Sequence, residues 1–157
     1  MAFSCGQDCQ LTRALLGRKV QLQSKNYPHH YIRHRNYEIW LDRHSYGNLF
    51  QKDSTFTIVV GLANKGISFR SKNMPNYYIR HRGYKCFISR GDGGSLFKKD
   101  ATWIPRVGLA DAHGVSFESA NYPGHYIRHQ YNRLRIDKDD GSQLFRNDAT
   151  FYLKYKN

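Results

Sequence analysis

The chain has few cysteines, few acidic residues and no long hydrophobic run, and each shortage excludes a class of protein. Only three of its 157 residues are cysteines, Cys5, Cys9 and Cys86, and an odd number without regular spacing does not form a disulfide framework. No second cysteine pair or suitably spaced histidine pair completes a zinc site with Cys5 and Cys9. We therefore expect three unpaired thiols, which favours a reducing compartment, and neither a metal ion nor another cofactor.

No apolar segment approaches the roughly 20 residues that a membrane-spanning helix needs. The first nine residues also lack the basic segment and the sustained apolar segment of a secretory signal peptide. These two absences predict a protein that does not insert into membranes. They favour the cytoplasm slightly and leave the compartment itself undetermined.

Acidic residues are half as common as basic ones, 12 against 25, which gives a formal net charge of +13. Such a surface attracts polyanions, so an anionic polymer is a possible partner. Aromatic residues make up 15% of the chain, enough to build a sizeable core and to exclude global disorder. The length suits one ordinary domain.

Three internal repeats determine the expected architecture. Residues 19–56, 66–103 and 114–151 align without gaps at offsets of 47 and 48, and eleven positions are identical in all three. The shared residues are a Ser, an Asn, a Pro, the run Tyr-Ile-Arg-His, a Leu-Phe pair, an Asp and a Thr. Short β-branched and aromatic runs alternate with turn residues, which predicts β-strands throughout, with one possible helical turn at 11–16.

Each repeat holds about four short strands, too few to bury both faces of a sheet, so the three repeats must share one core. Closure around a pseudo-threefold axis gives an all-β β-trefoil, a six-stranded barrel capped by three hairpins, which leaves no exposed strand edge. A three-bladed propeller is the rival, but propellers typically have four to eight blades. We expect a lead-in over residues 1–18 and one domain over 19–157, with repeats at about 19–65, 66–113 and 114–157. The expected core contains the Leu-Phe pairs, the Ile of Tyr-Ile-Arg-His, Phe69 and Phe117.

Polar residues also repeat three times, at positions that strand alternation does not explain. Each motif histidine stands nineteen residues before an aspartate and eight residues after an asparagine. The pairs are His34 and Asp53, His81 and Asp100, and His129 and Asp148; the asparagines are Asn26, Asn73 and Asn121. Asn-x-Pro is turn chemistry, the Thr of Asp-x-Thr can close a turn with that Asp, and Arg33, Arg80 and Arg128 suit ion pairs of the fold or surface charge. The His–Asp pairs fit a structural role and a ligand equally well.

Catalysis is disfavoured because a glycosidase needs two carboxylates at one bond, and each repeat supplies one. The repeated serines, Ser24, Ser71 and Ser119, carry no mark of a nucleophile. A carboxylate that accepts two hydroxyl protons, a neutral histidine and a nearby tyrosine ring suit a sugar instead. We therefore expect a sugar-binding protein that is not an enzyme.

The third repeat, in its segments 115–129 and 140–151, resembles the arabinofuranose-binding module, the AbfB domain or family 42 of the carbohydrate-binding modules. The similarity extends from Lys19 to the C-terminus. It implies a β-trefoil that binds terminal arabinofuranose branches of hemicellulose, with the sugar contacted by the motif histidines and aspartates: His34, Asp53, His81, Asp100, His129 and Asp148. Possible supporting residues are Asn26, Tyr37, Asn73, Tyr84, Asn121 and Tyr131.

The chain departs from the family pattern at several positions. Gly114 and Tyr152 stand where members commonly carry two cysteines, so that disulfide is missing. The family's Asn-aromatic pair after the motif is kept as Asn36-Tyr37, becomes Gly83-Tyr84 and is transposed in Tyr131-Asn132. The first repeat has Ser54 where the other two repeats have alanine, and the second repeat has Met74 where the other two have an aromatic residue. Each change is expected to weaken one of the three sites.

The favoured interpretation is a free-standing, non-catalytic lectin for furanosidic sugars, with arabinofuranosyl branches of a polysaccharide as the first choice and up to three equivalent sites. On this interpretation, a variant without the three aspartates keeps its fold and loses sugar binding. The alternative is an intracellular basic β-trefoil that binds an anionic surface or a protein, with vestigial sugar sites. Salt separates the two, because screening weakens polyanion binding far more than sugar binding.

Overall fold

The computed structural model describes residues 5–157, and its three repeats contain the same elements in the same order. A helix, α1 (Gln7–Leu15), precedes them. The first repeat contains β1 (Lys19–Ser24), β2 (His30–Arg35), β3 (Glu38–Arg43), α2 (Asn48–Asp53) and β4 (Phe56–Val60). The second contains β5 (Ile67–Ser71), β6 (Tyr77–Arg82), β7 (Lys85–Arg90), α3 (Ser95–Asp100) and β8 (Trp103–Val107). The third contains β9 (Val115–Ser119), β10 (His125–Gln130), β11 (Arg133–Lys138), α4 (Gln143–Asp148) and β12 (Phe151–Lys156).

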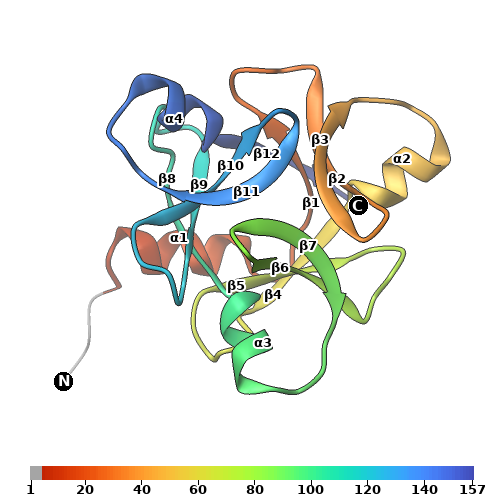
Figure 1. Ribbon diagram of the computed structural model, residues 1–157, viewed down its shortest axis with the longest axis horizontal. Helices are drawn as coiled ribbons and strands as arrows, with labels where there is room; N and C mark the ends of the chain where they lie inside the picture. Colours follow the sequence, from red (N-terminus) through yellow and green to blue (C-terminus); the bar gives the residue numbers. More distant parts are fainter. Residues whose placement is uncertain (1–4) are drawn as a thin grey trace.

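The strands form a closed barrel and a cap. Strands β1, β4, β5, β8, β9 and β12 pair antiparallel in a ring, because β1 pairs with both β4 and β12. The hairpins β2–β3, β6–β7 and β10–β11 meet one another through β3, β7 and β11, which pair in a triangle. Figure 1 shows the three hairpins near the centre and α2, α3 and α4 around them in three directions. The predicted β-trefoil is confirmed.

Each hairpin of the cap turns over two residues with positive φ. These pairs are Asn36-Tyr37, Gly83-Tyr84 and Tyr131-Asn132, with φ angles between 52° and 66°. A two-residue loop with both φ angles positive is the type I′ turn, whose twist matches that of the flanking strands and which Asn and Gly adopt readily. Transposing the tyrosine and the asparagine in the third repeat therefore preserves the turn.

The barrel core contains one large apolar side chain from each of its six strands. These are Leu22, Phe56, Phe69, Trp103, Phe117 and Phe151, all at most 1% exposed. Phe69 and Phe117 meet edge to face with ring centroids 5.0 Å apart, a favourable aromatic geometry. The predicted core positions Phe69, Phe117 and the motif isoleucines Ile32, Ile79 and Ile127 are confirmed, since the isoleucines are 1–3% exposed.

A six-residue helix precedes the last strand of every repeat, and the sequence pattern did not predict it, because six residues are too short to show a helical period. This helix contains the Leu-Phe pair and ends at the repeated aspartate. The phenylalanines Phe50, Phe97 and Phe145 are buried, but the leucines Leu49, Leu96 and Leu144 are 67–68% exposed. The prediction that both residues of the pair lie in the core is therefore wrong for the leucine. Adjacent residues on a helix point about 100° apart, so one faces inward and the other does not.

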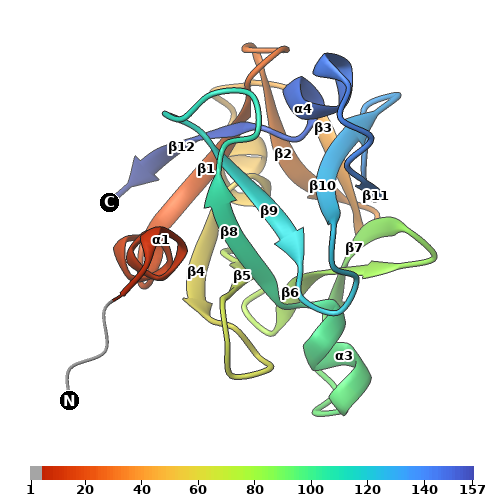
Figure 2. The same ribbon diagram turned by 90° about the vertical axis from the view of Figure 1, so that its left-hand side faces the viewer.

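Helix α1 lies on the outside of the barrel (Figure 2) and is longer than the single turn expected at 11–16. Leu15 is buried, and Leu11 and Leu16 pack against the core. Asp8 in the first turn forms an ion pair with Arg106 of β8. The part of the lead-in that the structure describes is thus ordered, while the first four residues lie outside the described residues. No helix in the described chain is long and apolar enough to cross a membrane.

The prediction of three unpaired cysteines is wrong. Cys5 and Cys9 form a disulfide at the start of α1, with their Cα atoms 5.4 Å apart. A separation of four residues at the start of a helix brings two Cα atoms within the 4.4–6.8 Å range of disulfides. A count of cysteines does not reveal this proximity. Cys86 is free and fully buried, and burial raises the pKa of its thiol to about 12. The thiol argument for a reducing compartment therefore no longer holds.

Tyr152 and Gly114, which replace the cysteines of the family pattern, lie close together. A Cβ atom on Gly114 would lie 3.4 Å from the Tyr152 ring and 2.7 Å from Cγ2 of Thr150, so a larger residue does not fit. The Tyr152 hydroxyl donates a hydrogen bond of 2.5 Å to Oδ2 of Asp111, in the β8–β9 loop. A side-chain contact thus connects β12 to this loop, at the position where the family pattern has a covalent bond.

Candidate functional site

Each motif histidine lies beside the aspartate of its own repeat, as the sequence suggested. The Nε2–Oδ1 distances are 3.5 Å for His34 and Asp53, 3.6 Å for His81 and Asp100, and 3.4 Å for His129 and Asp148. All six residues are buried, at 3–6% exposure. The histidine comes from the second strand of the repeat and the aspartate from the end of the short helix.

The asparagine of each site comes from the next repeat along the chain, which the sequence did not reveal. The Nδ2 atom of Asn73 donates to Oδ1 of Asp53 at 2.8 Å, and its Oδ1 lies 2.7 Å from Nε2 of His34. Asn121 bridges Asp100 and His81 in the same way, and Asn26 of the first repeat bridges Asp148 and His129 of the third. We name the triplets network 1 (His34, Asp53, Asn73), network 2 (His81, Asp100, Asn121) and network 3 (His129, Asp148, Asn26). All three lie at junctions between repeats.

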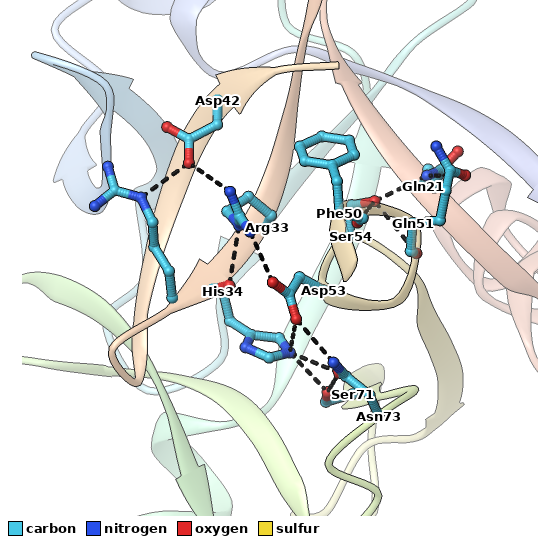
Figure 3. A network of polar contacts seen from close by, with 11 residues as sticks. Gln21, Arg33, His34, Asp42, Phe50, Gln51, Asp53, Ser54, Ser71 and Asn73 are labelled. Carbon is cyan, nitrogen blue, oxygen red and sulfur yellow. Dashed lines mark hydrogen bonds and ion pairs between the residues drawn. The ribbon is translucent and has the colours of Figure 1, made fainter. Parts of the chain in front are cut away.

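The repeated arginines hold the aspartates, which confirms their expected role in ion pairs. Arg33 donates from its terminal nitrogen to Oδ2 of Asp53 at 2.7 Å and from Nε to the backbone carbonyl of His34 at 3.1 Å. Figure 3 shows Arg33 between Asp53 and a second carboxylate, Asp42, at 3.1 Å. Arg128 is held likewise between Asp148 and Asp137, whereas Arg80 pairs with Asp100 alone among the described residues. The guanidinium and the asparagine amide together fix the orientation of each carboxylate.

The repeated serines and threonines are structural. Ser71 donates from Oγ to Oδ1 of Asn73 and accepts from the backbone N–H of Met74, and Ser24 and Ser119 do the same in their repeats. The threonine after each aspartate does not close a turn with it, contrary to the expectation. It donates to the helix carbonyl four residues earlier, as Thr102 does to Lys98 at 2.7 Å.

The hydrogen-bond pattern sets the tautomer of each histidine. The asparagine turns its N–H₂ group to the carboxylate, so its oxygen faces the histidine and can only accept. Nε2 therefore carries the proton, and Nδ1 of the neutral ring is an acceptor. Burial lowers the pKa of His81 and of His129, which favours this neutral form.

Network 3 opens into a pocket of about 290 Å³. His129 and Asp148 lie in its wall, together with Tyr27, Tyr131 and Leu144. The Tyr27 ring packs on the imidazole of His129, with centroids 4.9 Å apart, and remains 47% exposed. A buried polar end and an apolar, partly exposed rim are the usual composition of a small-molecule pocket.

Network 2 keeps a tyrosine at the position of Tyr27, and network 1 does not. In network 2, Tyr122 packs on His81 with centroids 4.7 Å apart, and Tyr84 contacts Tyr122 at 5.7 Å. In network 1, Met74 holds the position that Tyr27 and Tyr122 hold in the other two networks, directly after the asparagine Asn73. The methionine of the second repeat thus changes the first repeat's network. Ser54 lies apart from network 1 (Figure 3), because its hydroxyl bonds with Gln21 and with the backbone of Phe50.

The exposed leucines were not recognised from the sequence as possible site residues. Leu144 lines the pocket of network 3, and Leu49 and Leu96 hold the same position on their helices. The sequence did contain a signal for them. The same leucine recurs in all three repeats next to a phenylalanine that is buried, and two adjacent side chains of this kind need different surroundings. The predicted tyrosines Tyr37, Tyr84 and Tyr131 lie at the hairpin turns and are 47–93% exposed. In residues 5–157, no group of three or more potential ligands is arranged to hold a metal ion.

The model of the Alpha-L-arabinofuranosidase B (ABFB) domain matches residues 11–58 and 98–155 of the chain. No curated protein sequence matches the chain. Among solved structures, an arabinofuranosidase complexed with arabinofuranosyl-alpha-1,2-xylobiose has a TM-score of 0.80 and 29% identity, over 88% of this chain and 31% of that one. A GH54 a-l-arabinofuranosidase soaked with a cyclic sulfate inhibitor has a TM-score of 0.80 and 27% identity, over 98% of this chain and 32% of the other.

A β-trefoil named BEL has a TM-score of 0.65 at 14% identity, over 90% of this chain and 94% of the other, and shows the fold alone. The chain thus spans about a third of the length of the arabinofuranosidases that it resembles. The family model covers about two thirds of the chain, in two segments that leave residues 59–97 between them unmatched. The threefold network, the closed barrel and these matches agree, and the chain belongs to the AbfB domain family of carbohydrate-binding β-trefoil modules.

Proposed function

We propose that this module binds α-L-arabinofuranosyl branches of a polysaccharide through networks 1, 2 and 3, without catalysis. The observation that supports the proposal most strongly is the threefold occurrence of one buried carboxylate–imidazole pair bridged by an asparagine amide, with a pocket at network 3. The solved relative whose name includes an arabinofuranosyl oligosaccharide supports the choice of sugar.

The networks leave hydrogen-bonding capacity for a ligand. A carboxylate has about four lone-pair positions. Asp148 uses one on Arg128 and one on Asn26, both at 2.8 Å, which leaves capacity for two hydroxyl protons of a sugar. The Nδ1 atom of neutral His129 accepts a third. The exposed faces of Tyr27 and Leu144 suit the C–H side of a small furanose ring.

Each network holds one carboxylate, and the second carboxylates, Asp42 and Asp137, lie on the far side of the arginine from it. A glycosidase instead places two carboxyl groups about 5–9.5 Å apart across one bond. Each aspartate is also held in place by an ion pair with an arginine, which fixes it as a hydrogen-bond acceptor. We therefore infer a binding role, in which the networks hold a sugar and leave its bonds intact.

A shallow pocket of this kind binds with a dissociation constant near the millimolar range, about −4 kcal/mol. Three sites on one rigid barrel gain affinity for a branched polymer, because the second and third branches bind intramolecularly. Networks 2 and 3, with Tyr122 and Tyr27, bind more tightly than network 1, where Met74 offers no ring.

An NMR titration with methyl α-L-arabinofuranoside tests the proposal, with the pyranoside isomer as the ligand control. We expect shifts at the backbone amides of all three networks, largest at networks 2 and 3, and none with the pyranoside. In the Tyr27→Ala variant, shifts at network 3 disappear and those at network 2 persist. Tyr155→Ala is the matched control, because Tyr155 is 50% exposed and lies on β12 away from the pocket. Equal titration of Tyr27→Ala and the unaltered protein at network 3 would refute the site.

Catalysis is tested separately by incubating the protein with 4-nitrophenyl α-L-arabinofuranoside. We expect no release of nitrophenol above the rate without protein. Release that persists after repeated purification would contradict the binding role.

A further inference from the structure

A trough lies beside network 2, between α3 and the β4–β5 turn at residues 61–66. It consists of three hollows of about 390, 300 and 370 Å³. The first and second share Leu62 and Lys98, and the second and third share Ala63 and Lys99, so the three lie next to one another. The last hollow contains Asn121 of network 2. Figures 1 and 2 both show the β4–β5 turn beside α3.

Four cationic side chains line this trough: Lys65, Arg90, Lys98 and Lys99. All four are exposed, and none takes part in an ion pair among the described residues. None of the residues that line the three hollows is acidic. Asp92 stands in the neighbouring loop, where its Oδ1 accepts from the backbone N–H of Gly94 at 2.7 Å.

The other repeats keep only part of this charge at the equivalent positions, where Lys99 corresponds to Lys52, and Arg90 to Arg43 and Lys138. In the third repeat, Lys98 corresponds to Arg146, which pairs with Asp139, and Lys99 corresponds to the uncharged Asn147. Lys65 corresponds to His113, which bonds to Asp111. In the first repeat, Lys98 corresponds to Gln51, and Lys65 to Arg18, whose guanidinium stacks on Tyr155 at 3.7 Å. Only beside network 2 are the positions of Lys65, Lys98 and Lys99 all occupied by lysine.

We infer that this trough binds carboxylate groups of uronic acid residues in a polysaccharide whose arabinofuranosyl branch occupies network 2. The inference rests on the proposed function for the branch, and it adds an acidic main chain as the class of ligand. Lysine ammonium groups on flexible stems act as separate point charges, which suits single carboxylates spaced along a chain. Asn64 and Asn76 in the same walls can bond with sugar hydroxyls.

A nucleic acid fits this trough less well. Single strands bind where bases stack on exposed aromatic rings. The aromatic side chains of the trough, Tyr78 and Phe97, are half-buried and buried. The connection to Asn121, and so to a carboxylate–imidazole site, also points to a sugar polymer.

Calorimetric titrations with three oligosaccharides test the inference at 20 mM and 500 mM salt. The first carries an arabinofuranosyl branch on a neutral chain, the second carries the same branch on a chain with uronic acids, and the third is an oligouronate without arabinofuranose. The test variant is Lys65→Gln/Lys98→Gln/Lys99→Gln. The matched control is Lys19→Gln/Lys154→Gln/Lys156→Gln, which removes the same charge from exposed lysines of β1 and β12.

At low salt, the unaltered protein binds the branched acidic ligand about 10-fold more tightly than the neutral one, since three exposed ion pairs contribute roughly two- to threefold each. The preference disappears in the test variant and at high salt, and it survives in the control variant. Binding of the neutral branched ligand is the same in all three proteins.

Three outcomes overturn the inference: a preference retained by the test variant, an equal loss in both triple variants, or tighter binding of a single-stranded oligonucleotide than of the acidic glycan. If the neutral ligand does not bind but the oligouronate binds in a manner that depends on the three lysines, the trough stands and the proposed arabinofuranosyl function fails.

Discussion

Replacing Asp100 by asparagine is expected to destabilise the protein more than the same change at Asp148. Asp100 is 6% exposed and accepts from Arg80 at 2.8 Å, and the Arg80 side chain is 12% exposed. The amide of an asparagine keeps the shape but removes the charge, which leaves a buried guanidinium without a counterion. Breaking a buried pair in this way costs about 3–5 kcal/mol.

At Asp148 the cost is smaller, because Arg128 keeps Asp137 at 3.1 Å. Losing one charge-assisted hydrogen bond while another remains costs about 1.5–3 kcal/mol. We therefore expect the two variants to differ by roughly 1–2 kcal/mol in the free energy of unfolding, with Asp100→Asn the less stable. Against a total of about 5–15 kcal/mol, both single variants remain folded.

Urea denaturation at pH 7, followed by fluorescence of the buried Trp103, measures the difference. Ser89 is the position at which a second carboxylate can be restored in the second repeat. It pairs with Tyr78 in the strand register, as Asp42 pairs with Tyr31 and Asp137 with Tyr126 in the other repeats. Ser89→Asp in the Asp100→Asn background supplies the missing second carboxylate and should restore about 1–2 kcal/mol. Equal unfolding free energies for Asp100→Asn and Asp148→Asn, or no rescue by Ser89→Asp, would refute the counterion argument.

The same argument revises the expectation that a protein without its three aspartates keeps its fold. Arg80 without a counterion costs about 3–5 kcal/mol, and Arg33 and Arg128, which keep Asp42 and Asp137, cost about 1.5–3 kcal/mol each. The total of roughly 6–11 kcal/mol is comparable with the usual total stability. We expect the triple alanine variant to be strongly destabilised, so loss of its binding would not by itself report on the sites.

Three further predictions concern the thiols, the pH dependence and the junctions between repeats. Protein purified without reductant and unfolded in denaturant should present one titratable thiol, that of Cys86; three would contradict the Cys5–Cys9 disulfide. Burial lowers the pKa of His81 and His129 below the ordinary value of about 6.5, so the unfolded chain binds more protons below that pH and the unfolding free energy should fall between pH 7 and pH 5.5. NMR titration of the two imidazoles checks the direction, and pKa values at or above 6.5 would show it to be wrong. Asn26→Ala should abolish ligand shifts at network 3 and leave network 1 intact, at a cost of about 1–3 kcal/mol in stability, because it removes the amide that bonds both the buried carboxylate of Asp148 and the imidazole of His129. Loss at network 1 instead would mean that each site is built within its own repeat.

The sequence alone determined the repeat, the fold and the identity of the polar residues. Eleven positions identical at fixed spacing require three copies of one unit, and a unit of four short strands has to share its core with the others. The two-residue hairpin turns, such as Gly83-Tyr84, were not predicted, although such loops depend on local preferences.

Only the tertiary structure decided which residues meet. The asparagines join the networks of the preceding repeat around the barrel, because the end of one repeat's helix packs against the first turn of the next. A substitution in one repeat, such as Met74, therefore alters another repeat's network. The short helices escaped detection because six residues give no period, and they expose Leu144 while they bury Phe145. The charge count of +13 likewise fixed no location. That Lys65, Lys98 and Lys99 lie together beside Asn121 follows from the packing of α3 against the β4–β5 turn, which brings together residues more than 30 positions apart.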